Sequence, residues 1–190
     1  MALLYPVQGS WTEDDYLALG TNRLVELSEG CIEVLPTPTK LHQRMVRFLS
    51  FLIQEFVSAR GLGEVLFAPL PVRLWPGTFR EPDIVFVRPE RGEYAGQPEG
   101  ADLVMEVLSP GEENRRRDVE IKREEYARAG IPEYWIVDPE GRRVTVLVLE
   151  GATYREHGAF GPDDTATSAT LAGLAVSVAD LFASGTQEGH

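Results

Sequence analysis

Two short apolar segments of this chain each contain one internal acidic residue, and they constrain the fold more than any other feature. Residues 81–87 and 102–108 are rich in β-branched residues and lie between stretches that contain proline and glycine. Apolar runs of this length and composition predict buried central strands. A hydrophobic content of 43% in 190 residues is sufficient for one α/β domain with a substantial core. We expect that domain to cover residues 1–183, followed by a disordered tail over 184–190.

The remaining apolar periodicity predicts a central mixed β-sheet flanked by helices and preceded by an N-terminal helix and a β-hairpin. Helices are expected over residues 12–19, 40–60 and 112–129. The hairpin is expected over residues 22–35, with further strands at 64–67, 71–75, 133–137 and 144–149, and near Tyr154. A final turn is expected at residues 179–182.

Each of the two central strands places its acidic residue on an otherwise apolar face. Because side chains alternate between the faces of a strand, Glu106 shares a face with Val104 and Leu108. Asp83 likewise shares a face with Val85. If the strands pair antiparallel with Asp83 opposite Glu106, the two carboxylates are cross-strand neighbours, about 5.5 Å apart at Cβ. Like charges this close favour a bound cation, and hard ions such as Mg²⁺ or Mn²⁺ prefer carboxylate oxygens.

Lys122 is the third candidate for this site. All 18 basic residues except Lys40 and Lys122 are arginine, so a lysine suggests a role that needs a compact ammonium group. Val119, Lys122 and Tyr126 form one stripe of the predicted helix, which would face the sheet. There Lys122 could position or deprotonate a water, or stabilise developing negative charge.

Structural roles alone could also explain these three residues. Glu106 could be a buried acid satisfied by arginine or backbone donors. Asp83 could belong to a turn that follows Pro82. Lys122 could be exposed and could pair with Asp118, one helical turn earlier.

A longer set of residues resembles a known nuclease family. The set comprises Pro82-Asp83, Glu106 to Pro110, Asp118, Lys122, Tyr126 and Glu133 to Asp138. It resembles the Uma-type family of restriction endonuclease-like proteins, which is catalogued as a domain of unknown function and belongs to the PD-(D/E)xK superfamily. The resemblance covers about residues 22–182. It implies a type II restriction endonuclease-like fold and metal-dependent hydrolysis of DNA.

The resemblance has one departure and adds two candidates. The usual lysine lies two residues after the second acid, where this chain has Leu108, so the resemblance implies that Lys122 replaces it. Glu33 matches an acidic position of the family and could complete the metal site, or it could be a solvated strand carboxylate. His42 could contact a phosphate or assist a water, although an isolated histidine is often a capping or packing residue.

Net charge keeps a second class of function open. At −12 the chain repels nucleic acid at long range, which favours a catalytically inactive binding or regulatory module with the same fold. A nuclease would need a local basic surface, for which Arg115, Arg116 and Arg117 are candidates, although they could equally be a solvated helix end. A metal-free hydrolase with paired carboxylates is a third alternative.

The expected setting is cytoplasmic, with DNA as the partner. Cys31 is the only cysteine, so no intramolecular disulfide can form. The first ten residues lack the basic and apolar regions of a signal peptide, and no apolar run is long enough to cross a membrane. A homodimer would suit cleavage of two strands.

Overall fold

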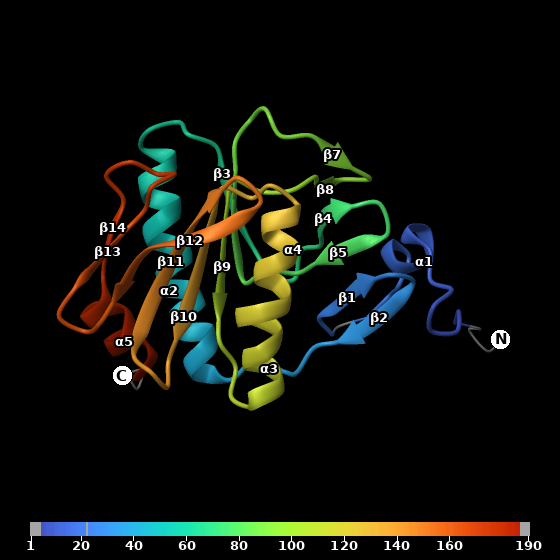
Figure 1. The fold of residues 1–190 in the computed structure, drawn as a ribbon, viewed down its shortest axis with the longest axis horizontal. Helices are drawn as coiled ribbons and strands as arrows, with labels where there is room; N and C mark the ends of the chain where they lie inside the picture. The colour runs from blue at the N-terminus through green and yellow to red at the C-terminus, as the bar shows by residue number, and fades with distance from the viewer. Residues whose placement is uncertain (1–4, 22, 187–190) are drawn as a thin grey trace.

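A six-stranded mixed sheet forms the centre of the computed structural model, which describes residues 5–21 and 23–186. Its strands are β3 (Glu64–Phe67), β6 (Ile84–Val87), β9 (Leu103–Val107), β10 (Glu133–Asp138), β11 (Arg143–Glu150) and β12 (Thr153–Phe160). The strand order is β12-β11-β10-β9-β6-β3 (Figure 1). Strands β9 and β10 are parallel, whereas the other neighbours are antiparallel. The predicted central mixed sheet is confirmed.

Strands β6 and β9 pair in the antiparallel register that was assumed for the acidic pair. Ile84 lies opposite Met105, and Val85 lies opposite Val104. The same register places Asp83 beside Glu106, one position beyond the last paired residues. The predicted meeting of the two acidic side chains at one end of the central strands is therefore supported by the pairing itself.

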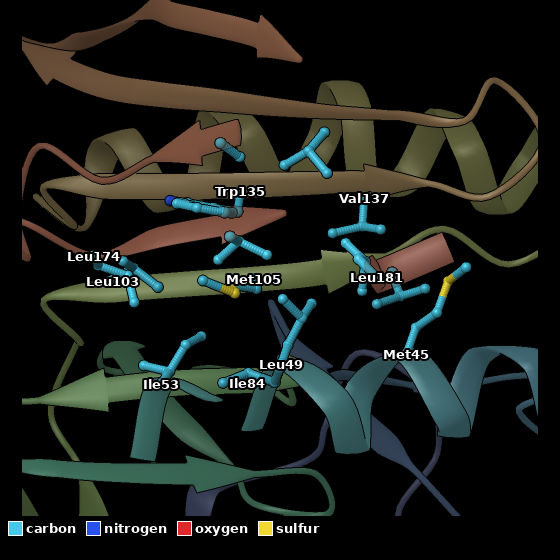
Figure 2. Close-up of a cluster of buried hydrophobic side chains, with 14 of the residues drawn as sticks. Met45, Leu49, Ile53, Ile84, Leu103, Met105, Trp135, Val137, Leu174 and Leu181 are labelled. Atoms are coloured by element: carbon cyan, nitrogen blue, oxygen red, sulfur yellow. The ribbon is translucent and has the colours of Figure 1, made fainter. Parts of the chain in front are cut away.

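One face of the sheet is covered by two helices, α2 (Lys40–Ser58) and α5 (Val178–Thr186). Thr39 caps α2, because its hydroxyl accepts a hydrogen bond from the His42 N–H at 3.2 Å. The apolar stripe of α2 packs against alternate residues of the central strands. Figure 2 shows this core, which includes Met45, Leu49, Ile53, Ile84, Leu103, Met105, Trp135, Val137, Leu174 and Leu181.

The opposite face is covered by α3 (Glu112–Arg116) and α4 (Lys122–Arg128), which are joined by a π-helical turn over Arg117–Ile121. The prediction of one regular helix over 112–129 was therefore incomplete. In this turn the Lys122 N–H donates to the Arg117 carbonyl, five residues earlier. Such insertions are often found at functional sites. Tyr126 and Ala127 of α4 pack into the second core with Tyr134.

The predicted hairpin is part of a second, four-stranded sheet. Its strands are β1 (Val25–Ser28), β2 (Cys31–Val34), β4 (Val72–Trp75) and β5 (Thr78–Arg80), in the order β2-β1-β5-β4. Helix α1 (Glu13–Leu17) packs there through Tyr16, which contacts Phe79. Strand β5 was not predicted. It pairs with β1 on the side opposite β2.

Smaller elements complete the described chain. Two short two-stranded sheets, β7 (Glu93–Tyr94) with β8 (Gln97–Pro98) and β13 (Thr165–Thr167) with β14 (Ala175–Ser177), were not predicted. Residues 184–186 of the predicted tail lie in α5, and the predicted turn at 179–182 is helical. Residues 187–190 of that tail, and residues 1–4 and 22 of the predicted domain, lie outside the described residues. None of the described helices is long and apolar enough to cross a membrane.

Candidate active site

Asp83 and Glu106 lie at the end of the paired strands β6 and β9, and both are buried. Oδ2 of Asp83 accepts a hydrogen bond from the Val107 N–H at 2.7 Å. Oε1 of Glu106 accepts hydrogen bonds from Lys122 Nζ at 2.8 Å and from the Tyr126 hydroxyl at 2.7 Å. The sheet and α4 therefore hold both carboxylates in fixed orientations.

Lys122 points into the protein, as the helical stripe predicts. It is 1% exposed, which contradicts the alternative of an exposed lysine. Its Nζ lies 3.0 Å from Glu26 Oε1 and 3.6 Å from Asp118 Oδ1, in addition to its contact with Glu106. Burial alone would lower the pKa of Lys122, but these carboxylates raise it above its ordinary value. Lys122 is therefore a protonated ammonium group at neutral pH.

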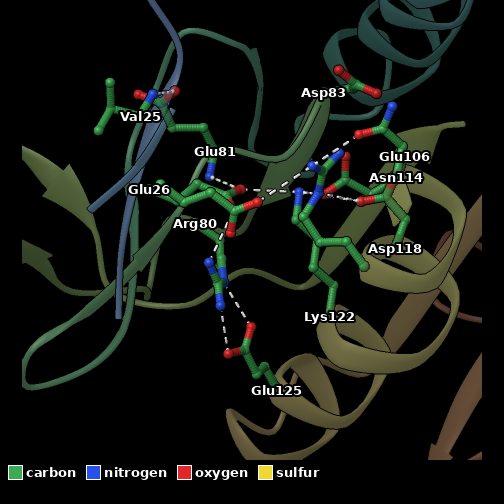
Figure 3. Close-up of polar contacts among 12 residues, drawn as sticks. Val25, Glu26, Arg80, Glu81, Asp83, Glu106, Asn114, Asp118, Lys122 and Glu125 are labelled. Carbon is green, nitrogen blue, oxygen red and sulfur yellow. Dashed lines mark hydrogen bonds and ion pairs between the residues drawn. The ribbon is translucent and has the colours of Figure 1, made fainter. Parts of the chain in front are cut away.

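Glu26 is a member of this cluster that the sequence reasoning missed. It is fully buried in β1, and its Oε2 accepts from Arg80 Nη1 at 2.9 Å. Arg80 in turn forms two 2.6 Å hydrogen bonds with Glu125 of α4 (Figure 3). A signal was present, because Glu26 lies between Val25 and Leu27 in an apolar strand, as Glu106 does in β9.

His42 lies in the first turn of α2 and contacts Asp83 directly, with Nε2 3.0 Å from Oδ2. Burial would lower the pKa of His42, but the hydrogen bond to Asp83 and its charge outweigh burial and raise it. The Nδ1 atom is buried and has no hydrogen-bond partner among the described residues. His42 therefore lies against the acidic pair, and its predicted contact with a phosphate or a water stays a prediction.

Glu33 and the three arginines lie further out. Glu33 is directly opposite Glu26 in the hairpin, but its side chain is 54% exposed and lies 3.6 Å from Arg117. Arg117 is largely buried and borders the site, whereas Arg115 pairs with Asp138 at 2.6 Å and Arg116 is exposed. A metal-binding role for Glu33 and phosphate contacts by the arginines stay predictions.

A cavity of about 30 Å³, large enough for a water or a single ion, lies between these groups. Its lining includes four carboxylates, those of Glu81, Asp83, Glu106 and Asp118. Burial raises the pKa of Glu106 and of Asp118, and it raises that of Glu81 to about 7. Burial thus disfavours the charged form of these three carboxyls, and a cation bound in the cavity would favour it.

The donor atoms fit a hard divalent ion. Each central carboxylate uses one oxygen for the hydrogen bonds given above, and neither Asp83 Oδ1 nor Glu106 Oε2 is engaged by a hydrogen bond from the described residues. Among residues 5–21 and 23–186, no three or more His, Cys, Asp or Glu side chains are grouped so that they alone could hold a metal ion. Mg²⁺ is commonly bound by one or two carboxylates, with waters and substrate phosphates as its other ligands.

Comparisons with known proteins agree with the resemblance drawn from the sequence. No curated protein sequence matches the chain significantly. A crystal structure described as a putative nuclease belonging to DUF820 from Anabaena variabilis has a TM-score of 0.74 to this chain at 22% sequence identity. The alignment covers 92% of this chain and 98% of that chain, so the two share a restriction endonuclease-like fold. A family model described as "Putative restriction endonuclease" matches residues 13–179, and the chain therefore belongs to this Uma2 family.

Proposed function

We propose that this protein is a Mg²⁺-dependent endonuclease that hydrolyses phosphodiester bonds in DNA. The observation that carries the proposal is the convergence of Asp83 and Glu106 on one small cavity, with the Lys122 ammonium 2.8 Å from Glu106. Membership of the family and the shared fold support a nuclease. The metal and the DNA substrate are inferred from the chemistry of these side chains.

Asp83 and Glu106 would hold Mg²⁺, or Mn²⁺, with Glu33 as a further candidate ligand. A bound Mg²⁺ would polarise the phosphate and lower the pKa of an attacking water. Backbone and side-chain donors of the protein itself orient the two carboxylates, so that the ligands of the ion are preorganised. Preorganisation of this kind reduces the reorganisation that the reaction requires.

Lys122 would act as a charge and not as a base. The neighbouring carboxylates raise its pKa, which favours the protonated ammonium form over a free amine that could accept a proton from water. An ammonium group in a buried position can orient the attacking water and stabilise negative charge that develops on the phosphate. His42 would hold Asp83 through Nε2 and would assist at the same phosphate.

The experiment that tests the proposal compares wild type with Glu106→Gln by Mg²⁺ calorimetry and plasmid nicking. We expect wild type to bind Mg²⁺ and nick DNA, to lose nicking in EDTA, and to lose both properties in Glu106→Gln. Glu120→Gln is the matched control, because Glu120 is an exposed glutamate on the π-helical turn that pairs only with Arg116 among the described residues. Nicking that survives EDTA would contradict the proposal and favour a metal-free hydrolase.

A catalytically inactive binding module is the second candidate, and one observation favours it. Lys122 already lies between Glu106 and Glu26, so the protein itself supplies part of the charge that the acids require. This alternative predicts that wild type neither binds Mg²⁺ at the acidic pair nor nicks DNA. A homodimer, which would suit cleavage of both strands, also stays a prediction.

A further inference from the structure

A groove of about 520 Å³ lies between α2 and the edge strand β3. It is lined mainly by apolar atoms, and two large aromatic side chains border it. Phe51 of α2 is 70% exposed and Phe67 of β3 is 59% exposed. Exposed aromatic rings of this size indicate a surface that contacts another molecule.

The charge of the groove is opposite to that of the protein. Its lining contains Lys40, Arg44 and Arg47, and no acidic residue from the described chain. None of these three cations forms an ion pair with a described carboxylate, although Arg44 donates a hydrogen bond to the Gly185 carbonyl at 3.2 Å. In a chain with a net charge of −12, a local group of uncompensated cations selects an anionic partner.

The groove begins beside the candidate active site. Lys40 lies two residues before His42 on α2. On the other side, Phe67 pairs with Ile84, and the following Ala68 N–H donates to the Asp83 carbonyl at 3.2 Å. From Lys40 to Phe51 the helix rises about 16 Å at 1.5 Å per residue. This length corresponds to roughly five stacked nucleotides of one strand.

We infer that the α2–β3 groove binds an unpaired segment of the nucleic acid strand that continues from the candidate active site. Lys40 and Arg47 contact its phosphates, and Phe51 and Phe67 stack on its bases. A duplex keeps its bases paired and stacked internally, so exposed phenyl rings favour a strand whose bases are free. The inference rests on the proposed function and specifies its substrate as DNA with a single-stranded region, such as a frayed end or a flap.

Binding is tested apart from cleavage by fluorescence anisotropy in EDTA. The probes are a fluorescein-labelled oligothymidylate of about twelve nucleotides, within the range of single-strand site sizes, and a duplex of the same length. We expect wild type to bind the single strand more tightly than the duplex. Phe51→Ala should weaken single-strand binding by roughly fivefold or more, since loss of one base–aromatic stack has at least this effect. Arg47→Gln should make the dependence of log K on log salt shallower by about 0.7.

Two control variants lie away from the groove. Arg155→Gln removes an exposed arginine of β12 that pairs with Glu150, and Val7→Ala removes an exposed apolar side chain. Both should bind the oligonucleotide as wild type does. Equal affinities for wild type, Phe51→Ala and Arg47→Gln would overturn the inference. It would also be overturned if wild type is a dimer that Phe51→Ala converts to a monomer, because the groove would then be a self-association surface.

The experiments can contradict either the nuclease proposal or the groove inference without contradicting the other. If wild type binds the oligonucleotide through the groove but does not nick DNA with Mg²⁺, the groove inference holds and the nuclease proposal fails. If wild type nicks DNA but the groove variants bind and nick as wild type does, the nuclease proposal holds and the groove inference fails.

Discussion

Glu26 Oε1 lies 3.0 Å from Lys122 Nζ, so a strand of the N-terminal sheet supplies a charge partner to the lysine of the candidate active site. Lys122 is on α4, and the two residues are far apart in the sequence. Arg80 extends the connection, because it contacts both Glu26 and Glu125. The N-terminal sheet and α4 are thereby joined through buried charges at the point where the chemistry is proposed.

Glu26→Gln should destabilise the protein and reduce nicking together. Removal of one charge from a buried ion-pair network costs about 3–5 kcal/mol. Nicking should fall because the position of the Lys122 ammonium is no longer fixed. Urea unfolding and plasmid nicking measure the two effects. Glu125→Gln, which changes the outer end of the network, should destabilise less and leave nicking closer to wild type. If nicking falls equally in Glu26→Gln and Glu125→Gln, the loss of nicking follows from the loss of stability, and Glu26 has no separate effect on Lys122.

Lys122→Met should reduce stability by a similar amount and nicking by more, because it leaves Glu26 and Glu106 without their shared cation. We expect a loss of about 3–5 kcal/mol in the free energy of unfolding at pH 7 and no detectable nicking. The double variant Lys122→Met/Glu106→Gln should recover part of the lost stability without recovering activity, since one buried charge has been removed. A double variant less stable than Lys122→Met would contradict this account of the cluster.

Asp83, Glu106 and Lys122 could be predicted because each breaks a simple local pattern. A carboxylate within a buried strand and a lysine on the inner stripe of a helix are visible without coordinates. The β6–β9 register was only assumed, and the strand pairing supplies it. Glu26 and Asp118 also have sequence signals, but their burial beside Lys122 required tertiary information. Burial of Glu26 depends on pairing between β1 and β5, which are far apart in the sequence.

The π-helical turn marks a second limit of sequence reasoning. It leaves both Asp118 and Lys122 buried, with Asp118 3% exposed, although the segment reads as an ordinary charged helix. Helical periodicity assumes a constant angle per residue, so it cannot reveal an inserted residue. Glu33 was named because it matches an acidic position of the family, whereas it is Glu26 that the packing of the hairpin buries.

His42→Asn should weaken catalysis through Asp83. The substitution removes the Nε2 contact at 3.0 Å, so Asp83 loses one of the two groups that orient it. Loss of such an orienting partner typically reduces metal affinity or activity by about 10- to 100-fold. Nicking rates as a function of Mg²⁺ concentration separate the two effects. His157→Asn is the control, since His157 is exposed and its side chain hydrogen-bonds only to Thr167 among the described residues. Unchanged Mg²⁺ dependence and rate would exclude this role.

Mg²⁺ should stabilise the folded protein if the acidic pair binds it. A ligand that binds only the folded state at 100 times its Kd adds about 2.7 kcal/mol. We therefore expect the melting temperature of wild type to rise with Mg²⁺ concentration, and that of Glu106→Gln to rise less. Differential scanning fluorimetry measures this without any nucleic acid. The same increase in both proteins would place the bound ion elsewhere.

Glu13 links stability to pH at a distance from the active site. Its Oε1 accepts from Arg73 Nε at 2.9 Å and from the Gly77 N–H at 2.7 Å, so it holds α1 against β4 and the β4–β5 turn. The hydrogen bond from Arg73 lowers the pKa of Glu13 below its ordinary value of 4.5. Since the folded state favours the ionised form, this contribution is present above about pH 4.5 and is lost as the pH falls through the lower, folded-state pKa.

Glu13→Gln should therefore be less stable than wild type at pH 7, by about 1–3 kcal/mol for hydrogen bonds to a charged group. The difference should shrink at a pH well below the ordinary pKa of glutamate, where both proteins carry a neutral side chain at this position. Urea unfolding across this pH range measures it. Asp14→Asn removes an exposed acid from the same helical turn and is the control. The difference between its free energy of unfolding and that of wild type should not shrink in the same way at low pH. A Glu13→Gln deficit that stays constant with pH would mean that packing, and not the ionised carboxylate, holds α1 in place.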